Sequence, residues 1–120
     1  MRYREKIYKY VKTKYSTVPE FLWAKFPNYA VLRHSENKKW YGLIMNVQKN
    51  KLGIKSMEKS DIINLKIGDL NYLCSLVRNS GFFEAYHMCK KNWVTIILDG
   101  TVPLNTILKL IDLSYVTTLK

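Results

Sequence analysis

A run of β-branched and apolar residues, VTIIL at positions 94–98, constrains the fold more than any other stretch of the sequence. Such a run is typical of a buried strand, and the Asp99-Gly100 pair that follows it signals a turn. The segment before it, EAYHMCKKNW at 84–93, predicts a second strand with aromatic and imidazole side chains, then a turn that carries Lys90 and Lys91. Alternation along the later strand places one set of side chains toward the core, and these are Val94, Ile96 and Leu98.

Three further strands are expected upstream. Segments 29–33 and 39–47 are strand-like and are separated by a short polar turn, so they predict a hairpin. Residues 61–67 predict a third strand, in which Lys66 points away from the main core while Lys91 of the later turn reaches solvent. The lysine-rich segment 48–60 is expected to be an exposed loop or second wing.

Helical spacing of apolar residues predicts three helices. The first covers residues 3–15 and the last begins near Pro103. Asp69 is expected to cap a short helix whose inner face includes Cys74. Basic side chains are expected on the solvated sides of the first helix, namely Arg2, Arg4, Lys6, Lys9, Lys12 and Lys14. The connector 18–28 is expected to cover an edge of the core with Phe21, Leu22, Trp23 and Phe26.

Together these elements predict an α+β fold, a two-layer α/β structure with an antiparallel five-stranded sheet and the order α-β3-α-β2-α. We expect the first and last helices to pack on the same face of the sheet. A chain of 120 residues can bury a core of its own, so we interpret residues 1–120 as a single domain. Two cysteines are too few for a disulfide framework, and Cys74 and Cys89 are expected to remain thiols.

The net charge of +11, from 20 Lys and Arg against 9 Asp and Glu, favours an anionic partner such as double-stranded DNA. The same composition also fits an AT-rich coding sequence, because Lys outnumbers Arg by 16 to 4. No stretch approaches the about 18 apolar residues that span a membrane, and the amino-terminal segment has charges where a signal peptide would be apolar. We therefore expect a cytoplasmic protein with no membrane partner.

Four segments carry a resemblance to a known family: RHSENKKW at 33–40, INLK at 63–66, AYHMCKKNW at 85–93, and LDGTVP with LIDLSY between 98 and 115. From about residue 18 to residue 115 the chain resembles the MmcQ/YjbR family of bacterial-type, largely uncharacterised proteins. The resemblance implies a fold similar to secretion chaperones and CyaY-like (frataxin-like) proteins, with a proposed double-wing DNA-binding surface. Cys89 stands where that family typically has asparagine, and Asn92 where it typically has histidine.

The main hypothesis for function is a basic surface between two wings that contacts DNA phosphates without reading sequence. The candidate nucleic-acid-binding residues are Arg33, Lys39, Lys66, Lys90 and Lys91 for phosphates, and Tyr86, His87, Asn92 and Trp93 for stacking or polar contacts. The alternative is that the aromatic residues belong to the core or a sheet face and that the lysines are ordinary turn residues.

Three other kinds of site have weaker support in the sequence. An enzyme or small-ligand site around His87 with Glu84 or Asp99 lacks a nucleophile and a phosphate-binding loop, so no catalytic residue or cofactor is expected. A metal site of His87, Cys89 and His34 lacks a second spaced ligand pair, so no metal is expected. A protein-interaction module or homodimer is the main alternative, in which a partner covers the sheet face that carries Trp93, Thr95 and Ile62.

Overall fold

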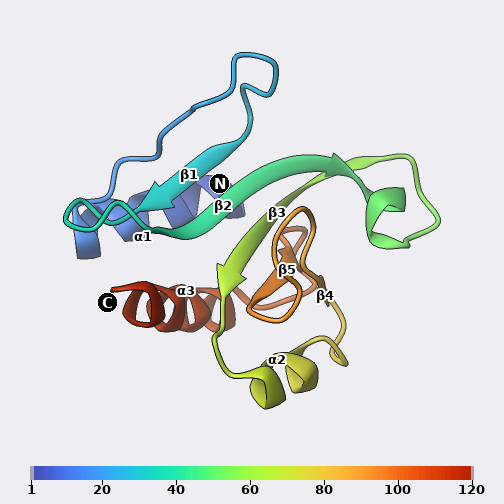
Figure 1. The fold of residues 1–120 in the computed structure, drawn as a ribbon. Helices are drawn as coiled ribbons and strands as arrows, with labels where there is room; N and C mark the ends of the chain where they lie inside the picture. Colours follow the sequence, from blue (N-terminus) through green and yellow to red (C-terminus); the bar gives the residue numbers. More distant parts are fainter. Residues whose placement is uncertain (1, 120) are drawn as a thin grey trace.

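Three α-helices pack against one face of a five-stranded sheet in residues 2–119, the part of the chain that this computed structural model describes (Figure 1). The elements are α1 (Tyr3–Tyr15), β1 (Ala30–Arg33), β2 (Trp40–Gln48), the 3-10 turn η1 (Lys49–Leu52), β3 (Lys59–Lys66), α2 (Leu70–Leu76), β4 (Phe82–Glu84), β5 (Trp93–Ile97) and α3 (Leu104–Thr118). The predicted α+β architecture and element order are confirmed. None of the described helices is both long and apolar enough to cross a membrane.

The strands lie in the order β1-β2-β3-β5-β4, and every neighbouring pair is antiparallel. After β3 the chain passes through α2 to the edge strand β4, and then returns as β5 between β3 and β4. Asp69 caps α2 as expected, because its carboxylate accepts a hydrogen bond of 3.1 Å from the backbone N–H of Tyr72.

The main core lies between the sheet and the three helices. Fully buried side chains reach it from both layers, with Ile7 and Val11 on α1, Ile107 and Ile111 on α3, and Ile63 and Leu65 on β3. The alternation predicted at the later strand is confirmed, because Val94, Ile96 and Leu98 face this core while Lys91 is exposed and Lys66 is half-buried. Each such aliphatic side chain contributes about 1.5–3 kcal/mol by burial, so the register is strongly specified.

The other sheet face, called here the second face, is covered by the chain's own loops. Its buried strand residues include Met45, Ile62 and Ile97, and side chains from three loop segments pack on them. These covering side chains are Trp23 and Tyr29 from the connector, Leu52 and Ile54 from the β2–β3 loop, and Tyr86 and Met88 from the β4–β5 loop. The expectation of a bare sheet face for a partner is therefore wrong at Ile62 and Thr95, which are both 0% exposed.

The strand predicted from Glu84 up to the turn at Lys90 and Lys91 is shorter and earlier than expected. Strand β4 ends at Glu84, and residues 85–92 form a loop that folds over the second face. Tyr86 and His87 are therefore loop residues, and His87 has a positive φ of 60° that no strand residue adopts. The local alternation of this segment resembles a strand, but its backbone bonds to buried side chains of the sheet instead of to a neighbouring strand.

Three smaller expectations are also wrong. Arg4 is buried rather than solvated, because its guanidinium donates to Asp61 Oδ1 at 2.9 Å and to the Asn28 carbonyl at 2.6 Å. Cys74 lies on the exposed side of α2, whose buried residues are Leu73 and Leu76. In the connector, Trp23 packs on the second face as a cover, whereas the side chains that remain largely exposed are Phe21, Leu22 and Phe26.

Candidate functional site

Strand ends bring several of the predicted residues to one end of the sheet. Arg33 ends β1 and pairs with Trp40 at the start of β2, and Lys66 ends β3 and pairs with Trp93 at the start of β5. Lys39 directly precedes β2 at the same end and is exposed. The sheet order therefore spreads these residues across four strands instead of gathering them at one point.

Among the predicted phosphate-binding cations, Arg33 and Lys90 have acidic partners. Arg33 donates to both carboxylate oxygens of Glu20, at 2.7 and 2.6 Å, and this pairing holds the pKa of Glu20 below its usual range. Lys90 lies 3.7 Å from a carboxylate oxygen of Glu84, with both side chains mostly exposed. An exposed pair of this kind contributes little energy, so Lys90 can exchange its partner for a phosphate more easily than Arg33 can.

Two buried polar side chains fix the start of the β4–β5 loop. Asn64 on β3 and Thr95 on β5 are cross-strand partners on the second face, and both are 0% exposed. The Thr95 hydroxyl donates to Asn64 Oδ1 and accepts from the Tyr86 backbone N–H at 2.8 Å. Asn64 Nδ2 donates to the Tyr86 carbonyl at 3.2 Å. The Tyr86 peptide is thus attached to the sheet by both its donor and its acceptor.

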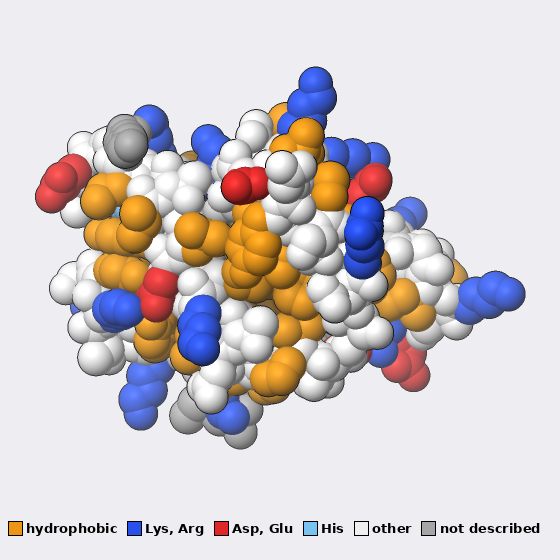
Figure 2. Space-filling view, turned by 90° about the horizontal axis from the view of Figure 1, so that it is seen from below, with side chains coloured by type: hydrophobic (Ala, Val, Ile, Leu, Met, Phe, Trp, Pro, Cys, Tyr) orange, Lys and Arg blue, Asp and Glu red, His pale blue; other side chains and the backbone are white. Residues whose placement is uncertain are grey.

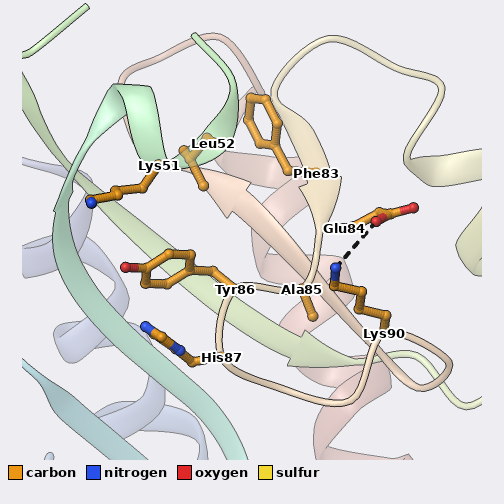
Figure 3. Close-up of a pocket in the computed structure, with 8 residues that line it drawn as sticks. All are labelled: Lys51, Leu52, Phe83, Glu84, Ala85, Tyr86, His87 and Lys90. Atoms are coloured by element: carbon orange, nitrogen blue, oxygen red, sulfur yellow. Dashed lines mark ion pairs between the residues drawn. The ribbon is translucent and has the colours of Figure 1, made fainter.

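His87 follows this anchored residue and stands at the boundary of two hollows. Its left-handed backbone turns the imidazole against the Tyr86 ring, with the ring centroids 4.1 Å apart. The two side chains project the same way from the loop (Figure 3). A non-glycine residue in this conformation is uncommon and is a reason to look for function.

The larger hollow, called here the wing groove, has a volume of about 430 Å³. One side is formed by Lys51 and Leu52 of the β2–β3 loop and the other by β4 and the β4–β5 loop (Figure 3). Leu52 and Phe83 lie at one end, while Tyr86 and His87 lie at the other. Lys51 was not among the predicted site residues, although its loop was predicted to be an exposed wing.

The second hollow, called here the aromatic pocket, has a volume of about 240 Å³. Its lining is almost wholly apolar and comprises Trp23, Phe26, Tyr29, Trp40, Leu43, Met45, His87 and Met88. The rings pack on one another, with Trp23 edge-on to Trp40 at 5.8 Å and Phe26 stacked on Tyr29 at 4.7 Å between centroids. The sequence shows these residues but not that three separate segments, namely residues 23–29, strand β2 and the β4–β5 loop, combine them into one pocket.

The remaining predicted residues do not line either hollow. Trp93 is half-buried beside Lys66, and Lys91 is exposed in the β4–β5 loop. The Asn92 carbonyl accepts from the Ile67 backbone N–H at 2.7 Å, while its side chain donates to Cys89 Sγ at 3.6 Å. The structure therefore gathers Tyr86, His87 and Lys90 of the nine predicted residues and adds Lys51 to them.

The side of the molecule on which α2 and α3 lie is not a basic surface. Figure 2 views the side on which α2 and α3 lie, and it shows a band of hydrophobic side chains with Lys and Arg scattered around it. The wing groove, in contrast, is a defined hollow with a lysine on each side, Lys51 on the β2–β3 loop and Lys90 on the β4–β5 loop.

The two histidines lie in different environments, one buried and one exposed. His34 is buried in the main core, where its Nε2 lies 2.7 Å from Thr118 Oγ1 and its ring packs against Tyr41 and Tyr115. His87 is exposed on the second face. Within residues 2–119, no three His, Cys, Asp or Glu side chains are grouped closely enough to hold a metal ion.

Comparisons with known proteins agree with this fold. The YjbR family model matches residues 12–117. A Bacillus subtilis (strain 168) protein named Uncharacterized protein YyaQ is 47% identical over 113 residues, which cover 93% of this chain and 94% of that protein. A Pseudomonas syringae crystal structure superposes with a TM-score of 0.92 at 40% identity, covering 96% of this chain and 97% of that one. Deinococcus radiodurans protein DR2400, at 20% identity and a TM-score of 0.75 over all of this chain and 80% of that one, shares the fold.

Proposed function

This chain belongs to the YjbR family, and from that premise and the geometry of the second face we propose that it binds nucleic acid through lysine contacts to phosphates. The observation that carries the proposal is the wing groove, an open hollow with lysine-bearing loops on both sides.

Charge on these two loops supports phosphate binding. Lys51 and Lys55 on the β2–β3 loop and Lys91 on the β4–β5 loop are exposed and have no ion-pair partner among the described residues. Lys90 has only the exposed Glu84 as a partner. In a protein with a net charge of +11, lysines at this groove would attract a polyanion.

The same geometry argues against reading of base sequence. The three helices of the described chain pack on the opposite face of the sheet, so no helix is placed to enter a major groove from the wing groove. Lysine acts as a flexible point charge and lacks the planar fork with which arginine recognises guanine. Binding is therefore expected to be weak and to have little sequence preference.

A salt-titrated anisotropy measurement tests the proposal. Engagement of about four to six phosphates predicts that log affinity falls with log salt at a slope of about −4 to −5. The double variant Lys51→Ala/Lys91→Ala should flatten this slope by about 1 to 2 units. The double variant Lys90→Ala/Lys91→Ala should also flatten the slope, toward the lower end of this range, because Lys90 is paired with Glu84.

The matched control is Lys9→Ala/Lys12→Ala on the exposed side of α1, which removes the same charge far from the groove. If this control weakens binding as much as the variants of the two loops beside the groove, then only bulk charge acts. Absence of binding by the wild type at about 50 mM salt, where phosphate contacts are strongest, would refute the proposal and leave the basic composition as a property of the coding sequence.

A further inference from the structure

We propose that the aromatic pocket receives one unpaired base of a single strand whose phosphates lie against the neighbouring lysines, so that the preferred ligand is single-stranded nucleic acid. This inference rests on the proposed function and adds a ligand class and a base-binding site to it. Neither follows from the wing groove alone.

The position of the pocket between two lysine-bearing hollows is the first argument. It shares His87 with the wing groove, which Lys51 and Lys90 line. On its other side it shares Phe26 and Tyr29 with a polar hollow of about 180 Å³ that Lys25 and Lys59 line. This polar hollow opens at the sheet edge toward the helical layer, because Asn46 and Lys59 lie on the helix-facing side of their strands and Asn46 bonds to Asp61, the partner of Arg4 on α1. Around the connector the surface therefore presents cations, then aromatic rings, then cations, which matches the phosphate–base–phosphate order of a polynucleotide.

The size and lining of the pocket are the second argument. At about 240 Å³ it is smaller than the about 300–1,000 Å³ typical of sites for whole cofactors or drug-sized molecules, so it fits a single ring system. Its lining contains no acidic side chain, so a cationic guest in an aromatic cage would meet the positive charge of the flanking lysines without compensation.

The exposure of the rings is the third argument. Phe26 is 49% exposed although it is stacked on Tyr29, so one face of this aromatic pair is open to solvent. Trp23 and Trp40 are half-buried and line the same pocket, with Trp23 edge-on to both Trp40 and Tyr29. A base stacked on these rings would remove apolar surface from water, and such stacking tolerates any base because every base has a π face.

Duplex nucleic acid cannot use the pocket in this way. Its bases are stacked on one another, and extrusion of a base costs a few kcal/mol. A duplex would therefore contact only the lysines, whereas a single strand would contact lysines and rings together. Preference for single strands is the consequence that separates this inference from phosphate binding alone.

The test compares three probes by fluorescence anisotropy at one salt concentration: a single-stranded DNA of mixed sequence and about 16 nucleotides, the matched duplex, and an abasic single strand of equal length. The wild type should bind the single strand more tightly than the other two. Phe26→Ala should weaken binding of the single strand by about 5- to 150-fold, the effect of one lost base stack, and leave the duplex and abasic affinities unchanged.

Phe21→Ala is the matched control, because Phe21 lies in the same connector and is 56% exposed but does not line the pocket. Both side chains are largely solvent-exposed, and unchanged melting temperatures would show that both variants remain folded. Equal wild-type affinity for the single strand and the abasic strand, or an unchanged single-strand affinity in Phe26→Ala, would overturn the base-binding site while phosphate binding stands. Failure of all three probes to bind at about 50 mM salt would instead overturn the proposed function itself and this inference with it.

Discussion

Replacement of Thr95 by valine should loosen the loop that carries His87 and Lys90. The change removes the hydroxyl that donates to Asn64 Oδ1 and accepts from the Tyr86 backbone N–H, and it keeps the shape of the side chain. A buried group left without a hydrogen-bond partner costs about 1–3 kcal/mol, and two groups lose their partner here. Water can reach the partly buried Tyr86 amide and replace part of its lost hydrogen bond. We therefore expect the free energy of unfolding to fall by about 2–3 kcal/mol, which is less than the two maximum penalties added together.

Urea unfolding monitored by tryptophan fluorescence measures this loss, and amide hydrogen exchange at Tyr86 reports loosening of the loop. Thr13→Val makes the same chemical change at an exposed position of α1 and should change stability by no more than about 0.5 kcal/mol. A Thr95→Val protein as stable as the wild type, with its Tyr86 amide still protected, would show that the Asn64–Thr95 pair does not hold the loop.

Three further predictions concern stability and reactivity. Burial alone would raise the pKa of Asp61, but hydrogen bonds from Arg4, Asn46 and Arg2 outweigh it and lower the pKa to about 2. Above about pH 4 the Asp61 carboxylate therefore contributes about 2 kcal/mol to the free energy of unfolding, and this contribution is lost as the pH falls toward 2. Urea titrations of Asp61→Asn should lack this acid dependence. Burial lowers the pKa of His34 below its ordinary 6.5, so stability should fall as the pH drops below about 6.5, and His34→Gln should flatten that slope; an unchanged slope would contradict this. Cys74 should react with a thiol reagent in the native protein, and Cys74→Ser should remove one reactive thiol without a change in melting temperature, whereas protection of that thiol would mean α2 packs differently.

The main core could be predicted from the sequence because it depends on local periodicity. The strand at 94–98 and the helical stripe after Pro103 each repeat with the period of their element, and both were found within a residue of their predicted place. The antiparallel pairing also followed from short connections, whereas the order β1-β2-β3-β5-β4 was not predicted, because the chain crosses through α2 to the edge strand β4 before it returns as β5.

The site was harder to predict because its contacts join distant segments. The alternation at residues 85–87 indicates a strand, but a hydrogen-bonding pair on β3 and β5 captures the Tyr86 peptide and turns the chain away. Arg4 shares the helical spacing of the buried Ile7 and Val11, but its charge suggested a solvated position, and its partner Asp61 comes from a strand 57 residues away. A polar residue inside each of two apolar runs, Asn64 within IINL at 62–65 and Thr95 within WVTII at 93–97, was the available signal of the loop anchor.

The aromatic pocket illustrates the same limit. Residues of the connector, of β2 and of the β4–β5 loop form it together, and no local pattern relates Trp23 to Met88. The sequence indicated only that the connector was too apolar to remain in water. The structure shows that part of it covers the second face while Phe26 stays largely open.

Mapping of backbone amide chemical shifts during titration with single-stranded DNA tests the central claim most directly, because it reports the location of binding as well as its existence. The largest shifts should fall in three segments of the second face, residues 49–55, 85–92 and 23–29, and should diminish at the first two in Lys51→Ala/Lys91→Ala. Shifts confined to α1, α2 and α3, or spread evenly over lysines of the whole surface, would contradict a binding site at the wing groove.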